Sequence, residues 1–264
     1  MCGRGKLNLI HPTAIIDSHA ELANDVTVGA FSVIGADVKI ESGTVIGPHV
    51  VIKGPTSIGK DNRIYQFTSI GEDPQDKKYA AEITRLEIGD RNTIREFTSM
   101  HRGTLQDQGV TKIGDDNLFM AYTHVAHDCV IGNHVIMANG ASLAGHVQLN
   151  NHAILGGFTL VHQFTQIGQF SFAAMGSAIT QDIPPFIMVG GKPTRPHGIN
   201  SVGMERNGIS VEDIRLIRNA YKIIYKMNLR LEDAIIQMEE LAGDSSELLN
   251  MISFLRNVRR GILR

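Results

Sequence analysis

Histidine is the residue type in this chain that most suggests chemistry. The sequence has 11 histidines, and four of them lie within 39 residues of one another: His124, His127, His146 and His162. An imidazole titrates near neutral pH, so it can act as a general base, a hydrogen-bond donor or a metal ligand. Residue types alone leave three hypotheses open: general-base catalysis on an activated acyl group, a metal site shared between subunits, and a binding edge without catalysis.

A six-residue repeat determines where these histidines lie. An apolar residue occupies every sixth position from Ile10 to Ile70, from Ile88 to Met100, and from Ile113 to Ile179. Glycine often follows this anchor, and a small or β-branched residue often lies two positions before it. A helix of period 3.6 or a strand of period 2 cannot produce such columns, whereas short strands separated by turns can. The repeat therefore predicts a parallel β-helix with the anchors along its axis.

The four histidines fall outside the anchor column. The period does not give the number of hexads in a coil. If three hexads make one coil, and coils lie about 4.8 Å apart, the four histidines are expected on or near one edge of the solenoid, with their rings facing outward. Cys129 falls in the column of small residues. We therefore expect it to be a packed core residue and not a nucleophile.

Two polar segments, 71–87 and 101–112, interrupt the repeat, and long excursions from a rigid solenoid are usually functional. The repeat ends at Pro185, so the predicted domains are a β-helix over 1–185 and a connector with an α-helical domain over 186–264. Ser210 with Asp213 has the pattern of an N-cap, and the first helix is expected to end at Asn228. A second helix should stop at Gly243, and a third should run from about 244–246 to Arg260.

Composition narrows the function classes. The chain has 264 residues, a net charge of −2 and 42% hydrophobic residues, which argues against wholesale disorder and against a nucleic-acid-binding surface spread over the protein. Its two cysteines, Cys2 and Cys129, provide no disulfide framework, and no apolar run is long enough for a membrane span. We expect a soluble, cytoplasmic protein.

Several strings resemble the UDP-N-acetylglucosamine O-acyltransferases of bacterial lipid A synthesis, which are hexapeptide-repeat acyltransferases. The resemblance covers nearly the whole chain. It rests on His124-Val125-Ala126-His127-Asp128-Cys129, Leu143-Ala144-Gly145-His146, Gly156-Gly157 followed by Val161-His162-Gln163-Phe164, Arg218-Asn219-Ala220-Tyr221-Lys222, and the opening Ile10-His11-Pro12-Thr13-Ala14-Ile15-Ile16. It implies a left-handed β-helix of triangular coils and a homotrimer.

The resemblance also implies an activity and roles for residues. Such an enzyme transfers an (R)-3-hydroxyacyl chain from acyl carrier protein to the 3-hydroxyl of UDP-N-acetylglucosamine, without a cofactor or a metal. His127 would be the general base, Asp128 would orient or charge-stabilise it, and the Gly145 N–H would hold the oxyanion. The residues implied in substrate binding are Asp76, Lys78, His124, His146, His162, Gln163, Asn200 and Arg206.

Two further expectations concern the acyl donor. Met175 matches a position that closes the acyl groove in this family, and its bulk predicts a shorter chain, of around ten carbons. Arg256, Arg259, Arg260 and Arg264 form a basic C-terminal segment that either attracts the acidic acyl carrier protein or is only a solvated surface. The alternatives to the acyltransferase are a zinc hydratase similar to the gamma-type carbonic anhydrases and a non-catalytic β-helix scaffold.

Overall fold

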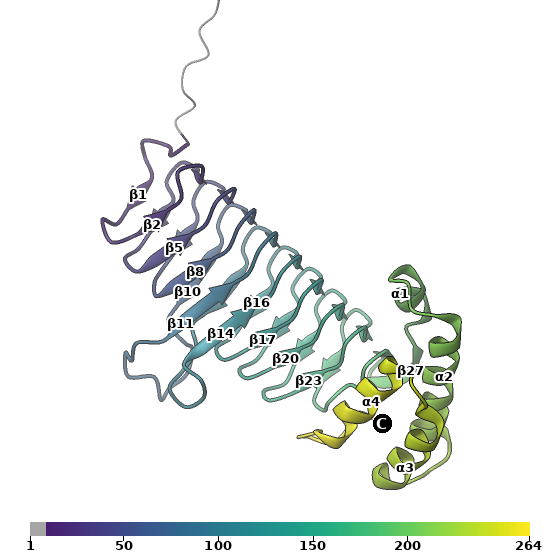
Figure 1. Cartoon of the computed structure of the whole chain (residues 1–264). Helices are drawn as coiled ribbons and strands as arrows, with labels where there is room; N and C mark the ends of the chain where they lie inside the picture. Colours follow the sequence, from purple (N-terminus) through teal and green to yellow (C-terminus); the bar gives the residue numbers. More distant parts are fainter. Residues whose placement is uncertain (1–8) are drawn as a thin grey trace, which may run out of the picture. The chain divides into compact units, whose positions relative to one another are not determined.

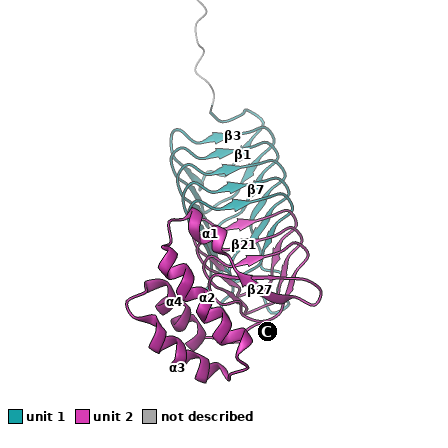
Figure 2. Ribbon diagram, turned by 90° about the vertical axis from the view of Figure 1, so that its right-hand side faces the viewer, with its two compact units in different colours: residues 1–129 teal, residues 130–264 magenta. Residues whose placement is uncertain are grey.

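The computed structural model describes residues 9–264, so Cys2 lies outside the described part. It divides into two compact units, Met1–Cys129 and Val130–Arg264 (Figure 2). In both units very short parallel strands stack into three faces, and turns join one face to the next (Figure 1). Thr27 pairs with Val45 and Val28 with Ile46, one coil of 18 residues further along the chain. The coil of three hexads, which the family resemblance implied, is confirmed.

The first unit consists of three such faces. One face contains β1 (Ile15–Ile16), β4 (Val33–Ile34), β7 (Val51–Ile52), β10 (Ser69–Glu72), β13 (Ser99–His101) and β16 (His124–Val125). The second contains β2 (Glu21–Leu22), β5 (Val38–Ile40), β8 (Thr56–Ile58), β11 (Arg85–Ile88) and β14 (Val110–Ile113). The third contains β3 (Thr27–Val28), β6 (Val45–Ile46), β9 (Arg63–Ile64), β12 (Thr93–Ile94) and β15 (Leu118–Phe119).

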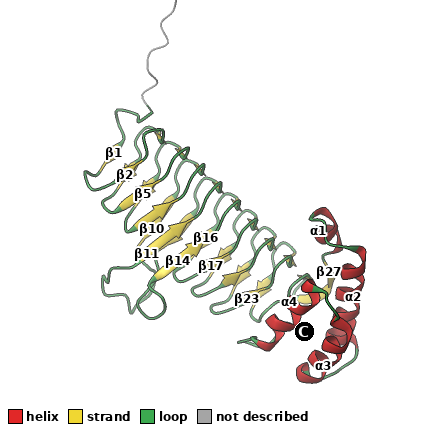
Figure 3. Ribbon diagram, in the orientation of Figure 1, coloured by secondary structure: helices red, strands yellow, loops and turns green. Residues whose placement is uncertain are grey.

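The second unit continues the same pattern and adds helices. Its faces contain β19 (Ser142–Leu143), β22 (Leu160–Val161) and β25 (Ala178–Ile179); β17 (Val130–Ile131), β20 (Gln148–Leu149) and β23 (Gln166–Ile167); and β18 (Ile136–Met137), β21 (Ile154–Leu155), β24 (Phe172–Ala173) and β26 (Ile187–Gly190). The last of these faces ends with β27 (Arg195–Ile199), which pairs antiparallel with β26. The helices are α1 (Ser201–Arg206), α2 (Val211–Lys226), α3 (Leu231–Ala242) and α4 (Ser246–Arg256), all at the C-terminal end of this unit (Figure 3).

The anchors form the core, as predicted. From Val28 onward the anchor residues of both units are buried, whereas Ile10, Ile16 and Leu22 in the first coil keep exposed surface. Cys129 is fully buried, which confirms its packing role. The glycine after an anchor permits close stacking: a Cβ on Gly29 would lie 2.5 Å from the Pro48 nitrogen of the next coil.

The predicted helices are largely confirmed. Ser210 caps α2 and accepts the Asp213 N–H, and Gly243 is the C-cap of α3. The third helix, α4, ends at Arg256 and not at Arg260, because the Asp182 carboxylate accepts the backbone N–H groups of Arg259 and Arg260 and draws the chain out of the helix. The short helix α1 was not predicted. No helix in the described part of the chain has the length and apolar character that a membrane span requires.

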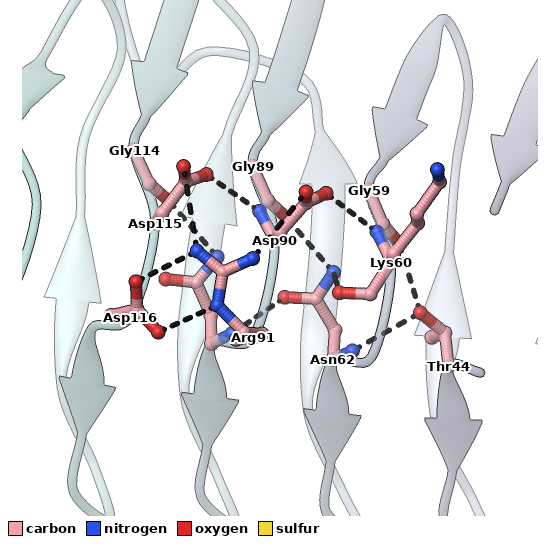
Figure 4. A network of polar contacts seen from close by, with 11 residues as sticks. Thr44, Gly59, Lys60, Asn62, Gly89, Asp90, Arg91, Gly114, Asp115 and Asp116 are labelled. Carbon is pink, nitrogen blue, oxygen red and sulfur yellow. Dashed lines mark hydrogen bonds and ion pairs between the residues drawn. The ribbon is translucent and has the colours of Figure 1, made fainter. Parts of the chain in front are cut away.

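One turn column of the first unit is sealed by a stack of buried amides, Asn62, Asn92 and Asn117, called the amide ladder below. Figure 4 shows the first of them, Asn62. Asn62 Oδ1 accepts the Asn92 N–H at 2.9 Å, and Asn92 Oδ1 accepts the Asn117 N–H at 3.0 Å. The Nδ2 groups of Asn62 and Asn92 donate to the carbonyl oxygens of Gly89 and Gly114. The amide ladder therefore satisfies backbone groups that the turns would otherwise leave unpaired.

Candidate active site

A buried pair, His127 and Asp128, lies in the turn that follows β16. Their side chains are joined by a hydrogen bond of 2.8 Å between His127 Nδ1 and Asp128 Oδ2. His127 is 6% exposed and Asp128 is 4% exposed. A carboxylate can only accept, so the Nδ1–H of His127 donates, and Nε2 is then the nitrogen that carries the lone pair. This is the tautomer that a general base requires.

His127 lies outside the anchor column, as predicted, but its side chain is buried and not open to solvent. The segment 102–109, which joins β13 to β14, lies over this turn and brings Thr104 against Asp128. Asp128 Oδ1 accepts the Thr104 N–H at 2.8 Å, and Oδ2 accepts the Thr104 hydroxyl at 2.7 Å. The Asp128 N–H donates to Thr111 Oγ1 at 2.8 Å. The pair is buried because this excursion covers it, which the hexad pattern does not reveal.

Two more histidines complete a cluster in the first unit. His101 packs edge-on against His124 with 5.0 Å between ring centroids, and His124 Nδ1 shares a 2.8 Å hydrogen bond with Ser99 Oγ. Burial, with a smaller contribution from neighbouring His127, lowers the pKa of His124. Burial also lowers the pKa of His101, to about 4, with His124 as the next cause. Both rings are therefore neutral at neutral pH. We call His101, His124, His127 and Asp128 the histidine cluster.

His101 was not among the predicted site residues. It is 4% exposed, and its Nδ1 is buried without a hydrogen-bond partner in the described part of the chain. A buried polar atom of this kind is unusual in a folded protein and often marks a functional position. The sequence held one indication of its role, because His101 directly follows the anchor Met100. Met100 lies in β13, which pairs with β16, and β16 begins at His124. Because 101–112 was interpreted as a loop, His101 was not considered as a site residue.

Asp76 and Lys78 lie in the first excursion, between β10 and β11. The strands extend into the segment predicted as loop, so the loop proper is 73–84. Asp76 Oδ1 accepts the Lys78 N–H at 2.9 Å, and the Asp76 carbonyl oxygen accepts the Tyr79 N–H at 3.1 Å. The two predicted residues therefore belong to one tight turn, with Lys78 exposed and Asp76 half-buried.

In the second unit, four of the predicted residues come together. The ring of His146 stacks on Phe164 at 4.4 Å between centroids, and the Phe164 N–H donates to the carbonyl oxygen of Gly145. His162 is exposed, and its Nδ1–H donates to the carbonyl oxygen of Gln163 at 3.0 Å. The turns after β19 and β22 thus bring Gly145 and His146 next to His162 and Gln163.

The remaining predicted residues of this unit lie further along its chain. Asn200 caps α1: its Oδ1 accepts the Gly203 N–H, and its Nδ2 donates to the carbonyl oxygen of Phe170 at 2.9 Å. Its amide thus has a structural task, while Arg206 at the other end of α1 is exposed. Met175 lies in the turn after β24 with 80% of its surface exposed.

Comparisons with known proteins agree with these observations. Residues 182–263 match the model described as UDP N-acetylglucosamine O-acyltransferase, domain 2, and residues 111–145 match the bacterial transferase hexapeptide model. The acyl-(acyl-carrier-protein)–UDP-N-acetylglucosamine O-acyltransferases of Halorhodospira halophila and Cupriavidus taiwanensis are 56% and 57% identical, each over 97% of this chain and 99% of the relative.

Solved structures extend the similarity to the fold. LpxA from Acinetobacter baumannii matches with a TM-score of 0.95 and 46% identity, covering 97% of this chain and 100% of that chain. The UDP-N-acetylglucosamine acyltransferase from Campylobacter jejuni matches with a TM-score of 0.91 and 35% identity, over 96% and 98%. The coils of the present chain form a left-handed parallel β-helix followed by C-terminal helices, as the sequence resemblance implied. The chain belongs to the family of UDP-N-acetylglucosamine O-acyltransferases.

Proposed function

We propose that this chain transfers an (R)-3-hydroxyacyl group from acyl carrier protein to the 3-hydroxyl of UDP-N-acetylglucosamine, in the cytoplasm, as the first step of lipid A biosynthesis. The names of its relatives state an acyl-carrier-protein donor and a UDP-N-acetylglucosamine acceptor. The observation that carries the proposal is the buried hydrogen bond between His127 and Asp128. This hydrogen bond places the proton of the His127 imidazole on Nδ1, so Nε2 can accept the proton of the acceptor hydroxyl.

The proposed reaction needs one base and one oxyanion contact. His127 Nε2 removes the proton from the sugar 3-hydroxyl as its oxygen bonds to the thioester carbonyl carbon. Asp128, held by Thr104 and Thr111, stabilises the imidazolium that forms. The Gly145 N–H donates to the carbonyl oxygen as that oxygen becomes negative. The C–S bond then breaks, and the leaving thiolate takes the proton back from His127.

A thioester is already an activated acyl group, so this mechanism uses neither a cofactor nor a metal. The remaining roles follow the family resemblance. Asp76 and Lys78 would bind the sugar from a neighbouring subunit of a homotrimer, and Arg206 suits a diphosphate because its planar fork bonds two oxygens at once. The residues proposed to line the sugar and acyl sites are His124, His146, His162 and Gln163, with Asn200 near the nucleotide.

Met175 is proposed to set the acyl length. Its exposed side chain has room to project from the turn, and an unbranched thioether fills irregular apolar space well. A filled groove end favours a donor of about ten carbons over longer ones, since each CH2 left in water forgoes about 0.8 kcal/mol. Met175→Gly should shift the preference toward longer donors, and an unchanged preference would remove the length-ruler role.

The test is a donor series. The purified full chain is incubated with UDP-N-acetylglucosamine and 3-hydroxyacyl carrier proteins of several lengths, and the products are identified by mass spectrometry. We expect one acyl group on the sugar 3-oxygen, formed fastest from the shorter donors. Absence of any acylated nucleotide sugar with every donor would contradict the proposed activity.

A further inference from the structure

We infer that Arg102 is a positioning residue: its guanidinium holds the loop 73–84, and thereby the turn of Asp76 and Lys78, in the conformation that meets the acceptor sugar. The inference rests on the proposed function for the identity of that acceptor. The tether itself is a property of the first unit, and it can be tested without any reaction.

The guanidinium of Arg102 gathers four oxygen acceptors. Nη1 donates to the carbonyl oxygens of Gly54 and Gly71, at 2.6 and 2.9 Å. Nη2 donates to the Asp73 carboxylate and to Tyr79 Oη, the latter at 3.1 Å. Two acceptors therefore lie at the root of the loop or on the neighbouring coil, and two belong to the loop itself. One side chain joins the loop to the coils.

The Arg102 side chain is only 8% exposed, whereas that of Asp73 is 60% exposed. A charge buried to this degree must be paired, and the cost of leaving it unpaired keeps its partners in place. Lysine would retain the charge at this position, but a single ammonium on a flexible stem cannot reproduce a planar fork that bonds to four oxygens. Arg102→Lys therefore keeps the positive charge and removes the hydrogen-bonding geometry of the guanidinium.

The loop has few other anchors. Within 73–84, only Pro74 and Thr84 are buried, and the large apolar Ile83 is 85% exposed. A segment with so little buried surface is expected to open locally unless specific contacts hold it. Tyr79 is the link to the predicted sugar contacts, because its N–H closes the turn on the carbonyl oxygen of Asp76. The Arg102 guanidinium thus contacts the phenol oxygen of Tyr79, and the backbone N–H of Tyr79 closes the turn that contains Asp76 and Lys78.

The root of the loop is fixed as well. Gly71 has a φ of +76°, and a Cβ there would collide with the carbonyl oxygen of Lys53, so the chain leaves the coil in one direction. The Arg102 N–H donates to the carbonyl oxygen of Glu72 at 3.1 Å. Two residues further on, Thr104 holds Asp128. The segment 101–104 thus contacts both the loop and Asp128, the hydrogen-bond partner of the proposed base.

The tether can be measured by limited proteolysis, because Lys77 and Lys78 are trypsin sites inside the loop. Arg102→Lys should raise the rate of cleavage after these residues by about tenfold, well below the unfolding temperature. Arg85→Lys is the matched control, since Arg85 makes a single exposed ion pair with Glu87; its cleavage rate should equal that of the wild type. Equal rates in all three proteins would overturn the tether.

The consequence for substrate binding is a split between kinetic constants. We expect Arg102→Lys to raise KM for UDP-N-acetylglucosamine by about tenfold while KM for the acyl donor and the pH dependence of kcat stay unchanged. A wild-type KM in this variant, with normal turnover, would overturn the positioning role. Absence of turnover in the wild-type enzyme would instead contradict the proposed function.

A second pair of variants guards against misfolding of Arg102→Lys. Asp73→Asn and Tyr79→Phe alter loop partners at the surface, so both should fold normally. Each removes one acceptor or weakens it, so each should raise the cleavage rate and KM for the sugar nucleotide in the same direction as Arg102→Lys, by a smaller factor. Variants that fold and leave both quantities at the wild-type value would contradict the inference.

Discussion

The amide ladder lies in one turn column of the first unit, whereas the histidine cluster lies on β13, on β16 and in the turn after β16. The two regions use polar side chains in opposite ways. In the amide ladder, the side-chain amides of Asn62 and Asn92 hydrogen-bond to the backbone of the coil beside them. In the histidine cluster, a buried nitrogen of His101 has no partner in the described residues, and the pKa values of His101 and His124 are lowered. A solenoid can thus place hydrogen-bonded amides, such as those of Asn62 and Asn92, where stability is needed and an incompletely satisfied imidazole, that of His101, where a substrate is expected.

The largest expected effect is on catalysis. His127→Ala should reduce kcat by about 10³-fold, because a positioned general base contributes about 10²- to 10⁴-fold. The free energy of unfolding should change little by comparison. Steady-state turnover with UDP-N-acetylglucosamine and a 3-hydroxydecanoyl carrier protein provides the measurement. A variant with near-normal kcat would remove the distinction between the two columns.

The converse effect is expected in the amide ladder. Asn92→Ala leaves the buried N–H of Asn117 and the half-buried carbonyl of Gly114 without their partners. The free energy of unfolding should fall by about 3 kcal/mol, since each such group costs about 1–3 kcal/mol. Turnover per folded molecule should stay near the wild-type value. Urea denaturation monitored by circular dichroism measures the first quantity, and a loss below 1 kcal/mol would contradict the assigned role.

A smaller effect concerns pH. The pKa of His101 is lowered to about 4 in the folded chain, and an unfolded histidine has a pKa of about 6.5. Between these values the unfolded chain binds more protons, so stability falls as pH decreases from about 6.5 to about 4. His101→Leu should flatten this slope without abolishing it, because His124 contributes in the same direction. Urea midpoints at several pH values would show whether the slope responds.

The hexads were sufficient to predict the buried anchors and the core position of Cys129, because both depend on the same repeated packing contact. The coil length of 18 residues came from the family resemblance, since the six-residue period does not give the number of hexads in a coil. The caps at Ser210 and Gly243 were sufficient for two helices, since capping is local. Tertiary contacts account for what the sequence did not predict. Contacts with Asp182 ended α4 early, and the segment that carries Thr104 covers the pair of His127 and Asp128. The residue types of the candidate site were largely visible in the sequence, but His101 and the tether at Arg102 depend on how two interruptions fold back on the coils.

The most direct test of the central claim is a double-mutant cycle on His127 and Asp128. If Asp128 acts through the imidazole, Asp128→Asn should lower kcat by about 10²-fold in the wild-type background and by little or nothing in the His127→Ala background. All three variants should give the unfolding transition of a folded protein. An equal loss from Asp128→Asn in both backgrounds would show that the two residues act independently and would contradict the proposed base.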